Sequence, residues 1–140
     1  MQQSFEFPAD TAVLAKIGEA TVAAGRSAGF TESEIGDIQL AVDEACTNTI
    51  MHGLKEDPSR TFQVVLRWAS GEVEIFIRET GDPFDPTEVP QPDITAALED
   101  RSVGGLGIYF IKQLMDEVKY RIDEKGMKTL YMVKRGAGCR

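Results

Sequence analysis

Residues 37 to 54 decide the fold, and they read Asp-Ile-Gln-Leu-Ala-Val-Asp-Glu-Ala-Cys-Thr-Asn-Thr-Ile-Met-His-Gly-Leu. Three polar residues in this stretch, Glu44, Asn48 and His52, recur at every fourth position. Because four residues of an α-helix rotate by only about 40° beyond a full turn, these side chains form one stripe. The residues that lie beside the stripe and can face a core are Ile35, Ile38, Val42, Ala45, Thr49 and Ile50.

The stripe combines a carboxylate, a carboxamide and an imidazole. These groups supply a base, a neutral oxygen ligand for a hard cation and a hydrogen-bonding group, which suits a magnesium-bound nucleotide. Taken alone, such a row is more often the solvated polar edge of an ordinary amphipathic helix. The other segments of the chain decide between the two interpretations.

The composition favours one soluble globular domain. The chain has 140 residues, of which 42% are hydrophobic and 27% charged, and this length can bury one substantial core. Its net charge is −8 and it has no Lys/Arg cluster, so we expect neither direct nucleic-acid binding nor attachment to an anionic membrane. Without a transmembrane-length apolar run or a signal-peptide pattern, a cytoplasmic location is expected.

The two cysteines, Cys46 and Cys139, do not indicate a disulfide framework. Cys46 lies about 240° around the helix from His52, so these two cannot form a nucleophile–base pair. We expect Cys46 to be a small buried residue. A zinc site is poorly supported, because the chain has one histidine and no paired cysteines.

The N-terminal half is predicted to contain an edge strand and two helices. Residues 3 to 8 alternate and stop at a proline, as a short edge strand does. Residues 10 to 28 have helical apolar spacing, and Gly29 follows as a left-handed cap. The capping-box spacing of Thr31-Glu32-Ser33-Glu34 starts the second helix near residue 32, and we expect it to end near Gly53.

The second half is predicted to be mostly strand. Residues 61 to 68 and 72 to 78 alternate as a hairpin with one core face. Residues 118 to 122, with Val118, Tyr120 and Ile122 on one face, and residues 127 to 134 form further strands. We therefore expect an α+β fold, a two-layer α/β sandwich with a mostly antiparallel sheet and helices on one face. It forms a single domain over residues 1–135, followed by a flexible tail at residues 136–140.

Two segments between these strands suggest function. Glu79-Thr80-Gly81-Asp82-Pro83-Phe84-Asp85-Pro86 begins at a strand end and opens a long loop to Val103, which is typical of a functional loop or of a plain surface insertion. Gly104-Gly105-Leu106-Gly107-Ile108 then opens a helix whose apolar residues extend to Val118. Glycines at a helix N-terminus let backbone N–H groups approach a phosphate. The pattern fits neither a P-loop nor a dinucleotide-binding fingerprint.

Taken together, the helical Glu-x-x-x-Asn-x-x-x-His, the strand-end Glu-x-Gly-x-Pro-Phe-Asp-Pro and the Gly-Gly-Leu-Gly-Ile resemble a known ATP-binding fold. It is the histidine-kinase-like (Bergerat) fold of gyrase, heat-shock chaperone, histidine-kinase and mismatch-repair ATPases. The chain most resembles the small bacterial anti-sigma factor serine kinases of partner-switching systems. The resemblance covers the chain from the first strand to residue 134 and is most specific at residues 42–48 and 104–118.

The resemblance implies roles for individual residues, with ATP and Mg²⁺ as cofactors. Glu44 matches the general base and Asn48 the magnesium ligand, and residues 82 to 103 match a lid over the nucleotide. Glu79 stands where the family usually has an aspartate that binds the adenine amino group, and the longer side chain is a departure from the pattern. The remaining residues implied in nucleotide binding are His52, Gly81, Gly104, Gly105, Gly107 and Thr129.

The function implied by the resemblance is that of an ATP-dependent protein serine/threonine kinase and anti-sigma factor. It would phosphorylate a small antagonist protein, sequester a sigma factor and form a homodimer. Because Glu79 departs from the pattern, a nucleotide-gated or nucleotide-free binding module without kinase activity is the alternative. A third possibility is an activating switch partner that binds a phosphatase.

Overall fold

The computed structural model describes residues 1–80 and 111–136, and within them five strands form one sheet. The elements in chain order are β1 (Gln2–Pro8), the 3₁₀ turn η1 (Thr11–Val13), α1 (Leu14–Ser27), α2 (Glu32–Asn48), the π-helical turn η2 (Thr49–Gly53), β2 (Thr61–Ala69), β3 (Glu72–Glu79), β4 (Glu117–Ile122) and β5 (Lys128–Arg135). Residues 111–114, just before β4, are helical.

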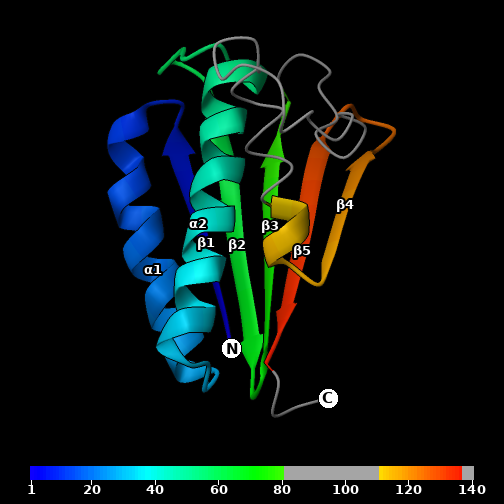
Figure 1. Ribbon diagram of the computed structural model, residues 1–140. Coiled ribbons are helices and arrows are strands. Elements are labelled where there is room, and N and C mark those ends of the chain that lie inside the picture. Colours follow the sequence, from blue (N-terminus) through cyan, green and yellow to red (C-terminus); the bar gives the residue numbers. More distant parts are fainter. Residues whose placement is uncertain (81–110, 137–140) are drawn as a thin grey trace, which may run out of the picture.

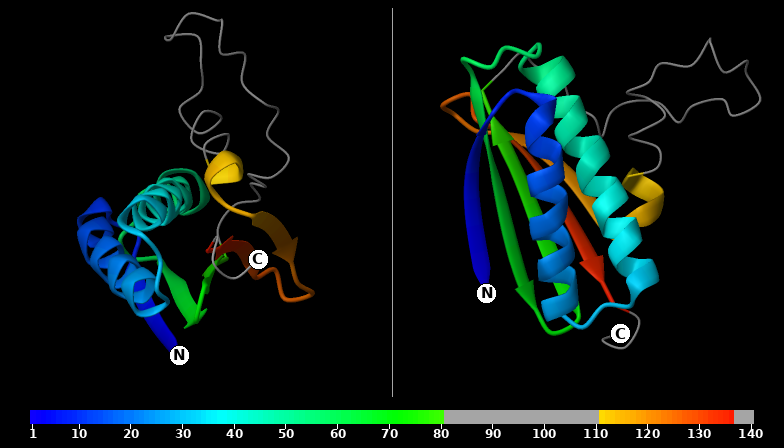
Figure 2. Two further views of the ribbon diagram at one scale, coloured as in Figure 1. Left: turned by 60° about the horizontal axis from the view of Figure 1, so that its bottom comes forward. Right: turned by 90° about the vertical axis from the view of Figure 1, so that its left-hand side faces the viewer.

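The sheet has the strand order β1-β2-β3-β5-β4, and every neighbouring pair is antiparallel. Helices α1 and α2 both cover one face of it, as the two views of Figure 2 show. This arrangement confirms the predicted two-layer α+β sandwich. It also confirms the first strand as an edge strand, because β1 pairs with β2 alone.

The core lies between the helices and this face of the sheet. Alternate residues of the β2–β3 hairpin point into it, and Leu66 and Ile75 are fully buried. From α2 the core receives the residues expected from the sequence, namely Ile35, Ile38, Val42, Ala45 and Ile50. Thr49, expected beside them, is only partly buried. Burial of this apolar face fixes α2 against the sheet, and with it the polar stripe.

Both helix boundaries around residues 29–32 follow the local signals. Gly29 has a φ of +86° and ends α1, a conformation that suits glycine. The capping box at the start of α2 is complete: the Glu34 N–H donates to Thr31 Oγ1 at 3.1 Å, and the Thr31 N–H donates to Glu34 Oε1 at 2.9 Å. The predicted start of the second helix is therefore confirmed.

We expect Thr31→Ala to lower the free energy of unfolding by about 0.5–2 kcal/mol, because it removes the acceptor for the Glu34 N–H. Urea denaturation followed by circular dichroism measures the loss. Ser33→Ala is the matched control, since this exposed residue lies in the same turn outside the capping box. Equal losses in the two variants would show that the box adds nothing to α2.

The far end of α2 differs from a simple helix end. The chain continues as η2, in which the Leu54 N–H donates to Thr49 O, five residues back, at 2.9 Å. This wider turn carries His52 and ends at Gly53, where the sequence predicted the end of the helix. Single π-turns inside helices occur frequently at functional sites.

One expectation at the C-terminal side needs correction. The sequence places Val118 on the apolar face of a helix as well as in a strand, and the structure places it in β4, where the Asp116 N–H already donates to Val133 O at 2.8 Å. Pairing with β5 decides this outcome. Ile122, on the same face of the strand as Val118 and Tyr120, is 54% exposed at the end of this edge strand.

The end of the domain also extends further than expected. Gly136, assigned to a flexible tail, is buried, and its N–H donates to Gly71 O at 2.8 Å. The rest of the expected tail, residues 137–140, lies outside the described residues.

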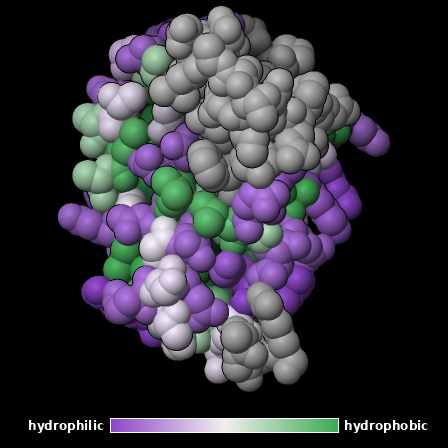
Figure 3. Space-filling model, viewed as in Figure 1, coloured by the Kyte–Doolittle hydropathy of each residue, from purple (hydrophilic) through white to green (hydrophobic). Residues whose placement is uncertain are grey.

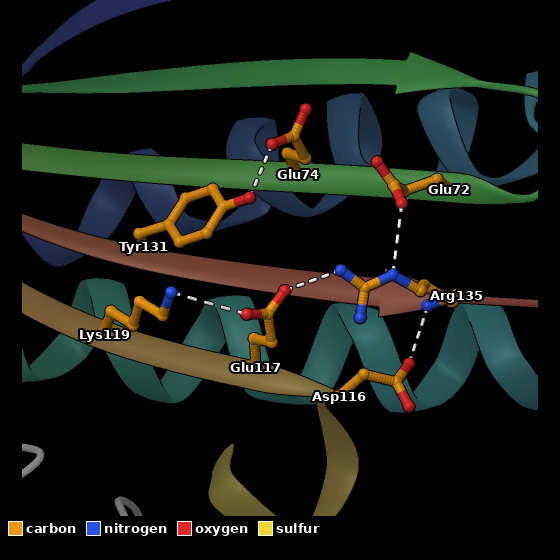
Figure 4. A network of polar contacts seen from close by, with 7 residues as sticks. All are labelled: Glu72, Glu74, Asp116, Glu117, Lys119, Tyr131 and Arg135. Atoms are coloured by element: carbon orange, nitrogen blue, oxygen red, sulfur yellow. Dashed lines mark hydrogen bonds and ion pairs between the residues drawn. The ribbon is translucent and has the colours of Figure 1, made fainter.

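The face of the sheet away from the helices carries a polar network that joins β3, β4 and β5 (Figure 4). Arg135 donates from Nε to Glu72 at 3.2 Å and from Nη2 to Glu117 at 2.6 Å. Tyr131 donates to Glu74 at 2.6 Å, and desolvation together with this hydrogen bond raises the pKa of Tyr131 to about 12. The hydrogen bond from Arg135 lowers the pKa of Glu117. These contacts hold the edge strand β4 beside β5.

The surface offers few large exposed apolar side chains. Among the described residues these are Met1, Leu40, Met51 and Ile122. On the face drawn in Figure 3, hydrophobic side chains are interspersed with hydrophilic ones. No helix within residues 1–80 and 111–136 is both long and apolar enough to cross a membrane.

Candidate functional site

The end of α2, the end of β3 and the start of β5 come together at one end of the sheet (Figure 1). A small cavity lies between them. Its volume is ≈20 Å³, which is room for about one water molecule. Besides apolar side chains, its walls include Asn48, Thr49, Gly53, Glu79, Tyr120 and Lys128. Residues from four separate segments thus form one polar-lined cavity.

Asn48 is the last residue of α2 and is only 6% exposed. Its Nδ2 is buried and has no hydrogen-bond partner in the described part of the chain. Buried polar groups in proteins are nearly always paired, and an unpaired donor costs about 1–3 kcal/mol. The carboxamide is therefore a group that a bound ligand can satisfy.

Glu79 is the last residue of β3 and is only 7% exposed. Its carboxylate lies against Gly53: a Cβ built on that glycine would stand 3.2 Å from Glu79 Oε1. Glycine at this position lets the carboxylate approach the backbone at the end of η2. The sequence predicted Gly53 only as a helix end and missed this contact.

Glu44 lies one turn before Asn48 and is partly buried. Desolvation raises its pKa from 4.5, and the neighbouring Asp43 carboxylate adds to the shift. A carboxylate that gains a proton more readily is a better base while it remains ionised. Cys46 is fully buried, which raises the pKa of its thiol and confirms it as an unreactive core residue.

Comparison with known proteins agrees with this geometry. Residues 7–134 match the histidine kinase-like ATPase domain family. The chain belongs to this family. It is 34% identical over 111 residues to the serine-protein kinase RsbW of Bacillus subtilis strain 168, which covers 76% of this chain and 68% of that protein. The RsbW of Bacillus cereus strain AH187 is 32% identical over 139 residues, covering 93% of this chain and 86% of that protein.

Solved structures show the same fold. The SiaB–SiaC complex from Pseudomonas aeruginosa contains a chain with a TM-score of 0.66 and 19% identity, covering 94% of this chain and 88% of that one. The RsbU and RsbW domains of a Mycobacterium tuberculosis protein give a TM-score of 0.66 at 18% identity, covering 96% of this chain and 32% of that one. The expected histidine-kinase-like fold is confirmed. The serine-protein kinase relatives confirm the expected class of enzyme.

The histidine kinase-like ATPase domain brings some of the predicted site residues together. Asn48 and Glu79 line the same cavity, and Glu44 precedes them on α2. His52 is exposed and is absent from the cavity wall, because the π-helical turn changes the residue spacing after Asn48. Gly81, Gly104, Gly105, Gly107 and the expected lid at residues 82 to 103 lie outside the described residues.

Thr129 is not brought to this cavity. It lies on the opposite face of the sheet, where it lines an open groove with Phe76 and Tyr131. Its neighbour Lys128 takes the cavity position instead and is only 6% exposed. The sequence held the necessary signal, because Lys128 alternates in phase with Leu130 and Met132, which are core residues.

The described residues fit a nucleotide-bound magnesium ion better than a metal held by protein alone. No cluster of three or more His, Cys, Asp or Glu side chains suitable for a metal occurs in residues 1–80 and 111–136. Magnesium commonly takes only one or two protein ligands and completes its shell with phosphates and water. Asn48 supplies a carboxamide oxygen of the kind that Mg²⁺ takes, and its buried Nδ2 is left to donate to another ligand atom.

Proposed function

We propose that this chain is an ATP-dependent protein serine/threonine kinase that acts as an anti-sigma factor. It phosphorylates a hydroxyl of a small antagonist protein, sequesters a sigma factor in the cytoplasm and works as a homodimer. The observation that carries the proposal is the buried Asn48 carboxamide, which lies one helical turn after Glu44 on α2. It shares a cavity with the Glu79 carboxylate of β3. The RsbW relatives, each named a serine-protein kinase, support it.

Each polar residue then has a separate task. Glu44 accepts the proton of the acceptor hydroxyl as the hydroxyl oxygen bonds to the γ-phosphorus of ATP and the bond from that phosphorus to the leaving ADP breaks. Asn48 would hold Mg²⁺ through its carboxamide oxygen, and the ion would supply positive charge beside the phosphates. Glu79 accepts a hydrogen bond from the adenine amino group. Gly104, Gly105 and Gly107, which lie outside the described residues, are assigned to phosphate binding from the sequence, and Gly81 to a further nucleotide contact.

One observation favours a second candidate, a binding module that sequesters its partner without phosphorylating it. The cavity of ≈20 Å³ holds about one water molecule, so a purine enters only if the wall moves. Glu79 also favours this candidate, because it departs from the aspartate that the resemblance leads one to expect at the adenine position.

Transfer of labelled phosphate from ATP to candidate antagonists encoded by neighbouring genes separates the two candidates. Label on a serine or threonine of an antagonist supports the kinase. Sigma-factor capture without label supports the binding module. Capture of a phosphatase instead of a sigma factor would contradict both and indicate an activating switch partner.

Saturating Mg-ATP should raise the melting temperature of the wild-type protein. A ligand that binds only the native state adds about 2.7 kcal/mol at a hundred times its Kd. Asn48→Ala should remove most of the magnesium-dependent part of the shift, as differential scanning fluorimetry with and without Mg²⁺ would show.

The matched control is Thr47→Ala, which changes the preceding residue on α2 and leaves the cavity wall intact. It should keep the full magnesium-dependent shift. An unchanged melting temperature of monodisperse wild-type protein in Mg-ATP would be incompatible with nucleotide binding.

A further inference from the structure

Lys128 is a buried cation that has no counterpart in the site predicted from sequence. It is the first residue of β5, is only 6% exposed and lines the same cavity as Asn48 and Glu79. Within residues 1–80 and 111–136 its ammonium forms no hydrogen bond or ion pair, and its Nζ is not one of the fully enclosed polar atoms without a partner. The ammonium therefore stays accessible and can donate a hydrogen bond to a ligand that enters the cavity.

The strand register places Lys128 directly opposite Glu79. Directly opposed residues of an antiparallel pair share one face of the sheet, with Cβ atoms about 4.5–5.5 Å apart. A carboxylate that accepts hydrogen bonds and an ammonium that donates them therefore reach the cavity side by side. Asn48 Nδ2 adds a second donor from the helix. A ligand that complements these residues offers a hydrogen-bond donor to Glu79 and, on an adjacent atom, an acceptor to Lys128.

We infer that Lys128 is a base-reading residue that donates to N1 of adenine while Glu79 accepts from the N6 amino group. This inference rests on the proposed ATP-dependent function and adds a specificity residue to it. The edge of adenine presents the N6 amino group, a donor, next to the ring nitrogen N1, an acceptor. The Glu79 carboxylate complements the first and the Lys128 ammonium complements the second. Hypoxanthine presents a carbonyl oxygen and an N–H in the same two places, so both contacts become repulsive or unpaired.

A base can enter so small a cavity only if part of its wall moves. The Lys128 stem is a flexible four-carbon chain, whereas the backbones of β3 and β5 are paired along their ladder. Displacement of this stem would open space beside Glu79 without breaking the sheet, with the ammonium within reach of the edge of the base.

The test compares binding of ATP and of 1-deaza-ATP, which has a C–H in place of N1, by isothermal titration. In the wild-type protein 1-deaza-ATP should bind about ten- to a hundred-fold more weakly than ATP, the usual effect of one hydrogen bond to a charged group. Lys128→Met should lose a similar factor for ATP and show no further loss with 1-deaza-ATP. ITP should bind the wild-type protein more weakly than ATP does.

Two controls separate base contact from attraction to phosphate. Lys125→Met removes the same charge from the exposed turn before β5 and should leave ATP affinity within about two-fold, as a screened surface charge does. Inorganic tripolyphosphate should bind the wild-type protein and Lys128→Met equally.

Several results would overturn the inference: unchanged or tighter ATP binding by Lys128→Met, full affinity of the wild-type protein for 1-deaza-ATP, or preference for ITP. If Lys128→Met binds ATP as tightly as the wild-type protein does, the base-reading role falls and the proposed kinase function stands. If the wild-type protein binds no ATP at all, both fall. Should Lys128→Met fail to fold, the wild-type comparison of ATP with 1-deaza-ATP still decides.

Discussion

Glu44→Gln should lower phosphoryl transfer to the antagonist by about two to four decades, the usual contribution of a general base. Glutamine has nearly the same shape but cannot take up a proton at neutral pH. Magnesium-dependent ATP binding should persist, because Asn48 and Glu79 line the cavity without help from Glu44. Single-turnover transfer and nucleotide affinity, measured on the same variant, separate chemistry from binding.

The matched control is Asp43→Asn, which removes a carboxylate from the neighbouring, exposed position of α2. It should retain transfer within about ten-fold, since it alters only the electrostatic environment of Glu44. Full transfer activity in Glu44→Gln would refute the assigned role. A parallel loss of binding and transfer would indicate that Glu44 braces the site instead.

The same variant should reveal the raised pKa of Glu44 through stability. Desolvation disfavours the ionised form in the folded protein, so the native state binds the proton more readily than the unfolded chain. Wild-type stability therefore falls as the pH rises through the folded pKa, and the penalty is absent below the unfolded value near 4.5. Glu44→Gln should be the more stable protein at pH 7, and the advantage should shrink towards pH 4 in urea titrations.

Ile38→Ala should lower the free energy of unfolding by about 2–5 kcal/mol, because it leaves a cavity in the core. Ile38 is fully buried between α2 and the sheet. Leu40→Ala is the matched control on the same helix: Leu40 is 46% exposed, and its loss should cost less than about 1 kcal/mol. Urea denaturation measures both values.

The loss at Ile38 should also appear in function. Helix α2 carries Glu44 and Asn48, so nucleotide binding should follow the folded fraction of the variant rather than fall independently of it. Equal destabilisation by the two substitutions would show that α2 does not pack as described.

The sequence by itself determined the elements whose signals are local. The capping box at Thr31 and Glu34 and the left-handed Gly29 each act within a few residues, so the boundaries they predict are confirmed. Alternation over residues 61–68 and 72–78 specified the hairpin, since a strand with one buried face needs a period of two. The stripe of Glu44 and Asn48 was predictable because helical spacing is fixed by the backbone.

Tertiary structure alone decided how these elements meet. The π-helical turn takes His52 away from Asn48, and Gly53 leaves room where Glu79 approaches it. Pairing of β3 with β5 sets Lys128 opposite Glu79 and sends Thr129 to the other face. Because side chains alternate along a strand, a shift of one residue exchanges the two faces, and long-range packing fixes which one meets the helices. The site therefore depends on contacts between segments that lie far apart in the chain.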